Sequence, residues 1–272
     1  MKKHISYRSA QLLSALNNQN KSFFTIKEAQ EILHESAEEA VRRLLIYMAQ
    51  RELLLRIKDG LYHVVPYENN IEEHFPNWHL TAEAIVHPKN YYIGFYSALD
   101  IHGLITQPSL TEQVVTDKQM IPKYQIVKKV KFEFITFNKN KFFGYERTWI
   151  DDFNKVNCSD IEKTLIDCLY KPNYAGGISE ITKAIFKCRE KIKPDKIINY
   201  LEKFDAQVVY KRMGFLLQHL QILPELTKEI QTKLTDSYTL IDPSLPKKGK
   251  HHSAWKIVDN IDIESTLKTI GT

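Results

Sequence analysis

Residues 25–65, TIKEAQEILHESAEEAVRRLLIYMAQRELLLRIKDGLYHVV, contain the local signals that decide the fold of the N-terminal part of this chain. Thr25 and Glu28 have the spacing of a capping box, in which two side chains satisfy free backbone N–H groups at the start of a helix. Ser36 and Glu39 repeat this spacing a few residues later. Two capped helices separated by so short a connection predict a helix-turn-helix.

The second predicted helix is followed by a hairpin pattern. Apolar residues recur in the helix at Ala37, Val41, Leu44, Leu45 and Met48. In residues 53–58 the sequence pattern changes to the period of two that is typical of a strand, and residues 61–64 are predicted to form a second short strand. Asp59-Gly60 between them supplies the positive-φ turn that a tight hairpin needs. Together these signals predict a winged helix, with the hairpin as the wing.

The face of the second helix opposite Val41 and Met48 is expected to enter a groove of DNA. At about 100° per residue, this face carries Glu39, Arg42, Arg43, Ile46 and Gln50. Arg56 and Lys58 lie two apart on the first hairpin strand, so they share one side and can reach phosphate. We predict six DNA-contacting residues: Lys27, Arg42, Arg43, Arg51, Arg56 and Lys58.

The alternative is a small helical subdomain whose charges are merely solvated. Glu35, Glu38 and Glu39 favour this alternative, because carboxylates at the start of a recognition helix repel the phosphates that it normally meets. The order of helix, helix and hairpin favours the winged helix.

The composition is that of an ordinary soluble chain, with 272 residues, of which 43% are hydrophobic and 26% charged, enough for two domains. The formal net charge of +5 permits nucleic-acid binding without requiring it. No window approaches the roughly 20 apolar residues of a membrane span, and polar residues rather than a hydrophobic leader follow Met1-Lys2-Lys3-His4. We therefore expect a cytoplasmic protein with no membrane partner.

The chain divides into residues 1–67 as the winged helix-turn-helix, 68–90 as a linker with one short helix, and 91–272 as a larger mixed α/β domain. This organisation predicts the α+β class. Residues 91–104 indicate a buried helix closed by Gly103, and a further capped helix begins at Ser159. Alternating segments at 128–137 and 142–150, joined by a turn at 138–141, predict a β-meander or hairpin.

The predicted β-meander is the most basic region of the chain. It carries a possible second nucleic-acid surface formed by Lys128, Lys129, Lys131, Lys139 and Lys141. Aromatic residues nearby, such as Tyr124 and Tyr145, could stack on bases. Alternatively, these lysines do no more than keep a strand edge soluble.

No recognised catalytic or metal-binding pattern is present in the sequence. Cys158, Cys168 and Cys188 are too widely spaced for a zinc site or a redox motif, which predicts buried free thiols. Gly249-Lys250 lacks the upstream glycine of a P-loop, and the Gly-Ser and Asp-x-Asp pattern of a nucleotidyltransferase is missing. Solvation or helix capping accounts for the scattered aspartates. We predict no metal, no cofactor and no enzymatic activity.

Six segments of the chain resemble the AbiEi antitoxins of bacterial type IV toxin–antitoxin (abortive infection) systems. They occur in the order expected for that family, after the predicted winged helix, and the match covers nearly the whole chain. The segments are YIGFYSALDIHGL at 92–104, SDIEKTLIDC at 159–168, YAGG at 174–177, KRMGFLL at 211–217, LIDP at 240–243 and WKI at 255–257.

This resemblance implies a function in two parts. The N-terminal domain would bind inverted repeats in double-stranded DNA of its own promoter and repress transcription. The C-terminal domain would counteract a nucleotidyltransferase toxin without forming a stable complex with it. The family supplies no catalytic residues, and the acidic start of the second helix departs from the polar or basic start expected there. The alternatives are a winged-helix regulator with a ligand-sensing second domain, and an enzyme acting on nucleotides or nucleic acid.

Overall fold

The computed structural model describes residues 3–105, 107, 109–261 and 263–268. It is a mixed α/β structure, which agrees with the predicted α+β class. Internal contacts divide the chain into two units, one comprising the described residues up to Pro88 together with Val127–Val130, the other the remainder. Residues 68–88, predicted as linker, therefore group with the first unit.

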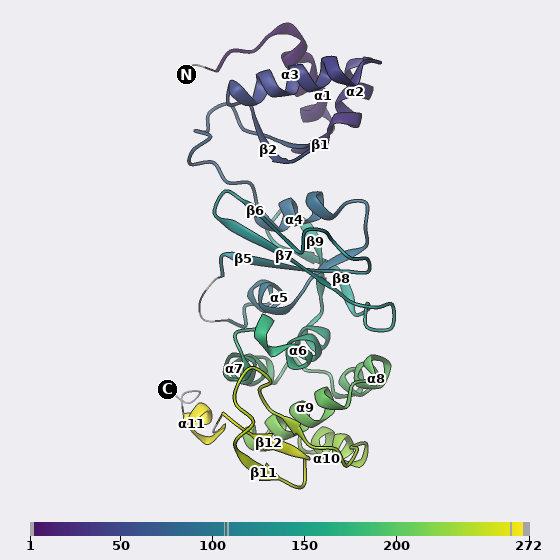
Figure 1. Cartoon of the computed structure of the whole chain (residues 1–272), viewed down its shortest axis with the longest axis vertical. Coiled ribbons are helices and arrows are strands. Elements are labelled where there is room, and N and C mark those ends of the chain that lie inside the picture. The colour runs from purple at the N-terminus through teal and green to yellow at the C-terminus, as the bar shows by residue number, and fades with distance from the viewer. Residues whose placement is uncertain (1–2, 106, 108, 262, 269–272) are drawn as a thin grey trace. The chain divides into compact units, whose positions relative to one another are not determined.

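The first unit combines four helices with a small antiparallel sheet (Figure 1). The strands lie in the order β1-β3-β2, and β2 and β3 form the predicted hairpin, with Gly60 at a φ of +75° in its turn. Strand β1 was not predicted, because three residues are too few to show a period. The elements are α1 (Tyr7–Asn18), β1 (Phe23–Thr25), α2 (Ile26–Leu33), α3 (Glu38–Gln50), β2 (Leu54–Lys58), β3 (Leu61–Val64) and α4 (Trp78–Val86).

The core of the first unit lies between its first three helices and the sheet. Leu12 and Leu16 on α1 and Leu45 and Met48 on α3 are at most 1% exposed, and they meet Phe24 of β1. The apolar residues therefore recur three or four apart on the helices, as burial of one helix face requires. The opposite face of α3 remains in solvent.

The second unit is built on a six-stranded mixed sheet in the order β6-β7-β5-β4-β9-β8. Strands form in both segments of the predicted β-meander or hairpin, but the pairing expected across the 138–141 turn is wrong, because β7 pairs in parallel with β5 and β8 pairs antiparallel with β9. Alternation identifies a strand but does not choose its neighbour. The strands are β4 (Tyr91–Ile93), β5 (Thr111–Thr116), β6 (Tyr124–Val127), β7 (Val130–Thr136), β8 (Tyr145–Trp149) and β9 (Lys155–Ser159).

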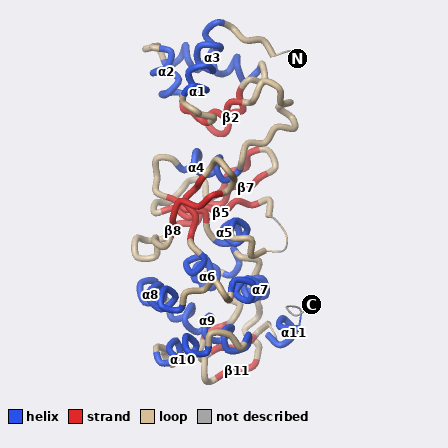
Figure 2. The backbone as a smooth tube through the Cα atoms, turned by 180° about the vertical axis from the view of Figure 1, so that it is seen from behind, coloured by secondary structure: helices blue, strands red, loops and turns tan. Residues whose placement is uncertain are grey.

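Helices of the second unit pack in layers beside this sheet, with α6 contacting α5, α7, α8 and α9 (Figure 2). Most of the buried apolar residues of the unit form one cluster around them. The helices are α5 (Phe95–Ile101), α6 (Ile161–Tyr170), the 3₁₀ turn η1 (Pro172–Tyr174), α7 (Ile178–Cys188), α8 (Pro194–Phe204), α9 (Gln207–Leu220), α10 (Pro224–Thr232) and α11 (Ile263–Lys268).

A second, three-stranded sheet packs against α9. It consists of β10 (Thr239–Leu240), β11 (Lys250–His252) and β12 (Ile257–Asp259) in the order β10-β12-β11. Trp255, 2% exposed, fits against Gly214 so closely that a Cβ at Gly214 would lie 2.0 Å from a ring carbon.

Among the residues that the structure describes, every helix is too short or too polar to span a bilayer.

Two predicted elements of the second unit begin at different residues. Residues 91–104 are not one helix, because Tyr91–Ile93 form β4 and α5 starts only after Gly94. Aromatic and β-branched residues favour a strand, and the sheet supplies partners on both sides of it. The predicted cap at Ser159 is wrong by one residue, because the Asp160 carboxylate accepts the hydrogen bond from the Lys163 N–H.

Candidate functional site

The start of α2 is fixed by the predicted capping box. Glu28 Oε2 accepts a hydrogen bond from the Thr25 N–H at 2.7 Å, and Thr25 Oγ1 accepts one from the Glu28 N–H at 3.3 Å. The helix ends at Leu33, and its C-cap residue His34 has a left-handed backbone, with φ of +50°, that turns the chain toward α3. The two helices are therefore joined by a short, defined turn.

The second predicted capping box does not form. Helix α3 begins at Glu38 with Ala37 as its N-cap, and no side chain caps it. Glu35 Oε1 instead accepts from the Ala37 N–H at 3.3 Å, while Glu35 Oε2 accepts from Arg8 at 2.8 Å. The hydrogen bond from Arg8 lowers the pKa of Glu35, so this carboxylate is ionised, and the Arg8 guanidinium balances its charge. The acidic start of α3 is thus partly compensated within the unit.

Helix α3 exposes the face that the sequence predicts. Val41, Leu45 and Met48 are buried, whereas Glu39, Arg43, Ile46 and Gln50 are exposed. Ile46 is 52% exposed in the middle of this face, a position suited to contact with a thymine methyl group. At about 1.5 Å per residue, the helix is roughly 20 Å long, which fits a DNA major groove.

A network of charges connects α3 to the hairpin. Arg42 is 2.7 Å from Glu38 on its own helix and 3.7 Å from Asp59 in the hairpin turn. Asp59 Oδ1 also lies 2.7 Å from Arg56 Nη2 on β2. All four side chains are at least 42% exposed, so these pairs are weak and can be exchanged for other anions. One carboxylate, that of Asp59, thus holds arginines from both elements.

The other four predicted contacts have different surroundings. Lys27 on α2 and Arg43 on α3 are exposed and have no ionic or hydrogen-bonding partner among the described residues. Arg51 lies over the Tyr47 ring at the end of α3, with its guanidinium carbon 5.2 Å from the ring centroid. Lys58 donates to the Ile85 carbonyl of α4 at 2.6 Å. The pairing register of β2 with β3 shifts between Arg56 and Lys58, and the two side chains have different partners, Asp59 for Arg56 and the Ile85 carbonyl for Lys58.

A histidine pair connects strand β3 of the hairpin to the segment that follows it. His63 Nε2 is 2.9 Å from His74 Nε2, and His74 Nδ1 is 3.0 Å from the Asn69 amide nitrogen. The His63 ring also packs against Phe23, with 4.6 Å between their centroids. Burial, with a smaller effect from His74, lowers the pKa of His63 to about 4. The pair is therefore neutral near pH 7.

The five lysines of the predicted second basic surface do not share one environment. Lys128 donates to the His74 carbonyl at 2.6 Å, and Lys131 pairs with Glu133 at 2.9 Å. Lys129 is exposed before β7, whereas Lys139 and Lys141 follow the far end of that strand. Lys141 donates to the Phe204 carbonyl at 2.9 Å. Three of the five cations are thus engaged within the protein.

A fully buried ion pair, not predicted, lies in the second unit. Lys163 and Asp167 are 0% exposed and contact each other one turn apart on α6. The Tyr92 hydroxyl donates to Asp167 Oδ2 at 2.9 Å, and Lys163 Nζ lies 2.9 Å from this hydroxyl. Burial lowers the pKa of Lys163 and raises that of Asp167, since removing water disfavours both charges. The available sequence signal was a lysine and an aspartate four apart in a helix, which places them on one face.

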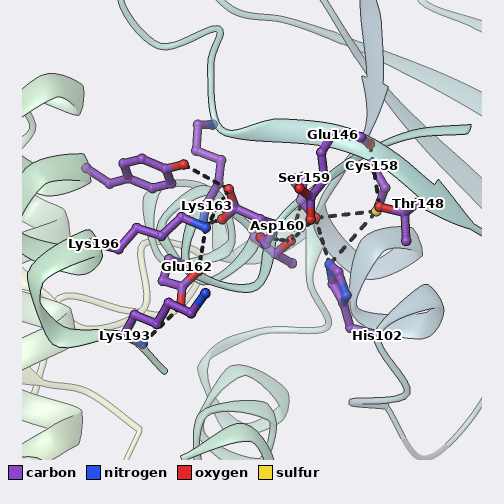
Figure 3. A network of polar contacts seen from close by, with 12 residues as sticks. His102, Glu146, Thr148, Cys158, Ser159, Asp160, Glu162, Lys163, Lys193 and Lys196 are labelled. Carbon is purple, nitrogen blue, oxygen red and sulfur yellow. Dashed lines mark hydrogen bonds and ion pairs between the residues drawn. The ribbon is translucent and has the colours of Figure 1, made fainter. Parts of the chain in front are cut away.

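Polar contacts around the start of α6 extend this arrangement (Figure 3). Lys196 Nζ lies 3.1 Å from both Asp160 and Glu162, and Glu162 also accepts from the Lys193 N–H at 3.0 Å. His102 Nε2 is 2.7 Å from the Ser159 carbonyl oxygen on the other side. These contacts join the N-termini of α6 and α8 and hold α5, so their role is structural.

Cysteine chemistry and metal binding receive no support from the described part of the chain. Cys158, Cys168 and Cys188 are free and buried, as predicted. Burial raises the pKa of each thiol, which makes the thiolate scarce near neutral pH. Within the described residues, no three histidine, cysteine, aspartate or glutamate side chains are arranged to hold a metal ion.

Comparison with known proteins identifies the fold but no family. No protein-family profile matches the chain, and no curated protein matches its sequence. Among solved structures, the crystal structure of the RV2827C protein from Mycobacterium tuberculosis is similar, with a TM-score of 0.72 and 13% sequence identity. The similarity covers 100% of this chain and 97% of that protein. At this identity the likeness concerns the fold alone.

Proposed function

We propose that the first unit is a winged helix that binds the DNA of its own promoter, with α3 as the recognition helix and the β2–β3 hairpin as the wing. The supporting observation is the charge network that connects them, in which Arg42 of α3 and Arg56 of β2 share Asp59. Exposed Lys27 and Arg43 extend this basic surface to α2 and along α3. Arg42, Arg43 and Arg56 then contact phosphates and base edges.

The complete proposal follows the AbiEi resemblance. The chain is a type IV antitoxin that represses its own operon by binding inverted repeats, and its second unit counteracts a nucleotidyltransferase toxin without a stable complex. These roles place the protein in the bacterial cytoplasm and require no enzymatic reaction by this chain. The second unit also contains the buried Lys163–Asp167 pair and the polar contacts around α6.

The proposal is tested by titrating the purified full chain against the DNA immediately upstream of its own gene and against an unrelated duplex, at several salt concentrations. We expect preference for the upstream DNA and weakening of both complexes by salt. Equal affinity for both duplexes would contradict promoter-specific repression. Co-expression with the neighbouring toxin gene tests the second role, and growth that is not rescued would contradict it.

A winged-helix regulator with a ligand-sensing second unit remains the second candidate, because the second unit contains an open cavity of about 650 Å³. Such a regulator would have no toxin gene beside it. Gene neighbourhood and rescue of growth therefore separate the two candidates.

A further inference from the structure

The cavity of about 650 Å³ in the second unit has the features of a built binding site. It lies between strands β5 and β7, the start of α5, the turn η1 and helix α7, all within that unit. Residues that line it include Tyr96, Thr111, Gln113, Glu133, Tyr174 and Glu180. The volume falls in the range of about 300–1,000 Å³ that is typical of small-molecule sites.

Gln113 offers a hydrogen-bond donor to this cavity. Its side chain lines the cavity although the residue is only 7% exposed. Gln113 Oε1 accepts from the Tyr96 backbone N–H at 2.9 Å, which fixes the orientation of the amide. The amide NH₂ group is then left facing the cavity, and it has no acceptor among the described residues. This nitrogen is not one of the fully buried atoms without a partner, so it remains accessible from the cavity, where a ligand oxygen or nitrogen can accept its hydrogen bond.

The backbone beside the cavity adopts conformations that ordinary residues avoid. Phe95 has a φ of +54°, in the left-handed region, and it presents the Tyr96 N–H to Gln113. Gly176 has a φ of +74°, and a Cβ there would lie 3.1 Å from Glu180 Cγ and 3.3 Å from the Tyr96 ring. Such backbone positions cluster at ligand sites, where surrounding contacts maintain them.

The charges around the cavity are balanced in pairs. Glu180 lies 2.8 Å from Lys183 on α7, and Glu133 lies 2.9 Å from Lys131 on β7. Among the described lining residues, no cation is left over for a phosphate group. Tyr96 and Tyr174 add two aromatic rings on which a planar group can stack. The chemistry therefore favours an uncharged ligand with a planar ring and hydrogen-bonding groups.

We propose that this cavity binds a nucleoside. Its base stacks on a tyrosine ring and accepts a hydrogen bond from the Gln113 amide, and its sugar hydroxyls meet the polar side chains at the mouth, such as Thr111 and Asn173. A nucleotide binds less well, because none of the described lining residues offers a free cation to pair with its phosphate. The site is independent of DNA binding, which involves only the first unit.

The test is saturation-transfer NMR and calorimetry on the full chain with adenosine, guanosine, cytidine and uridine. A nucleoside is expected to bind with a dissociation constant of about 0.1 mM, an ordinary affinity for a ligand of this size. Each nucleoside is compared with its monophosphate and with glucose. Tighter binding of the monophosphate or of glucose, or no signal from any nucleoside, would overturn the proposal.

Two variants locate the site. Gln113→Glu keeps an oxygen for the Tyr96 N–H but removes the donor, so affinity should fall by about tenfold. Asn173→Trp fills the mouth from an exposed turn without disturbing the core, and it should abolish binding. Lys139→Trp, in an exposed turn outside the cavity, serves as the matched control and should bind normally. Nucleoside binding that survives Asn173→Trp would show that the ligand lies elsewhere.

Discussion

Replacing Asp59 with asparagine should strengthen DNA binding. The Asp59 carboxylate lies 2.7 Å from Arg56 and 3.7 Å from Arg42, so in the proposed complex it opposes the phosphates that these arginines would contact. Asparagine has the same size, and Asn-Gly is favoured in tight hairpin turns, so the hairpin should keep its shape. The substitution changes one charge and little else.

The size of the effect follows from counterion release. One additional effective cation at the interface steepens the dependence of log K on log salt by about 0.9. A fourfold rise in salt, from about 50 to about 200 mM, then reduces the advantage of Asp59→Asn over the unchanged protein by about 3.5-fold. At the lower salt concentration we expect an affinity gain of about three- to tenfold, on promoter and unrelated DNA alike.

Fluorescence anisotropy with labelled duplexes at four salt concentrations measures both quantities. The matched control is Asp236→Asn, which removes an equally charged, fully exposed carboxylate that lies 3.2 Å from Lys256 in the second unit. It should leave the affinity and the salt slope unchanged. If the unchanged protein binds and Asp59→Asn has the same affinity and slope, Asp59 does not restrain the arginines at the DNA surface.

Three further predictions concern stability and are read from urea unfolding. Burial lowers the pKa of His63 to about 4, so between pH 6.5 and pH 4 only the unfolded chain binds a proton at this residue. The free energy of unfolding should therefore fall by about 3 kcal/mol over this pH range. His63→Phe should remove most of this loss. Gly214→Ala places a methyl group against Trp255 and should cost about 3 kcal/mol or more. Lys163→Met should lower the free energy of unfolding by about 3–5 kcal/mol, because it leaves Asp167 buried without its cation, and adding Asp167→Leu should restore most of that free energy. Equal stability of the single and double variants would contradict this account of the ion pair.

Local signals in the sequence predicted two features of the first unit, the start of α2 and the β2–β3 hairpin. The Thr25–Glu28 capping box and the Asp59-Gly60 turn involve residues close in the chain, so their geometry depends little on distant partners. The second box failed because Glu35 supplies the acceptor for the Ala37 N–H instead. The register shift of β2 between Arg56 and Lys58 also has no sequence signature here.

Long-range pairing accounts for what the sequence could not predict. Alternation located β7 and β8, but their partners β5 and β9 were set by the whole sheet. The Gln113 amide faces a cavity only because β5, α5 and α7 converge there. Likewise, the charge network around Asp59 depends on how closely the hairpin turn approaches α3, which spacing along the chain does not reveal.

The most direct test of DNA recognition by α3 is the affinity of Arg43→Glu for the promoter duplex. Arg43 is exposed and without an ionic or hydrogen-bonding partner among the described residues, so its reversal should leave the fold and unfolding transition unchanged. Lys187→Glu, an equal charge reversal on an exposed helical position of α7, is the control. We predict a loss of about tenfold or more for Arg43→Glu and none for Lys187→Glu. Promoter binding by a folded Arg43→Glu protein that equals that of the unchanged chain would contradict the assignment of α3 as the recognition helix.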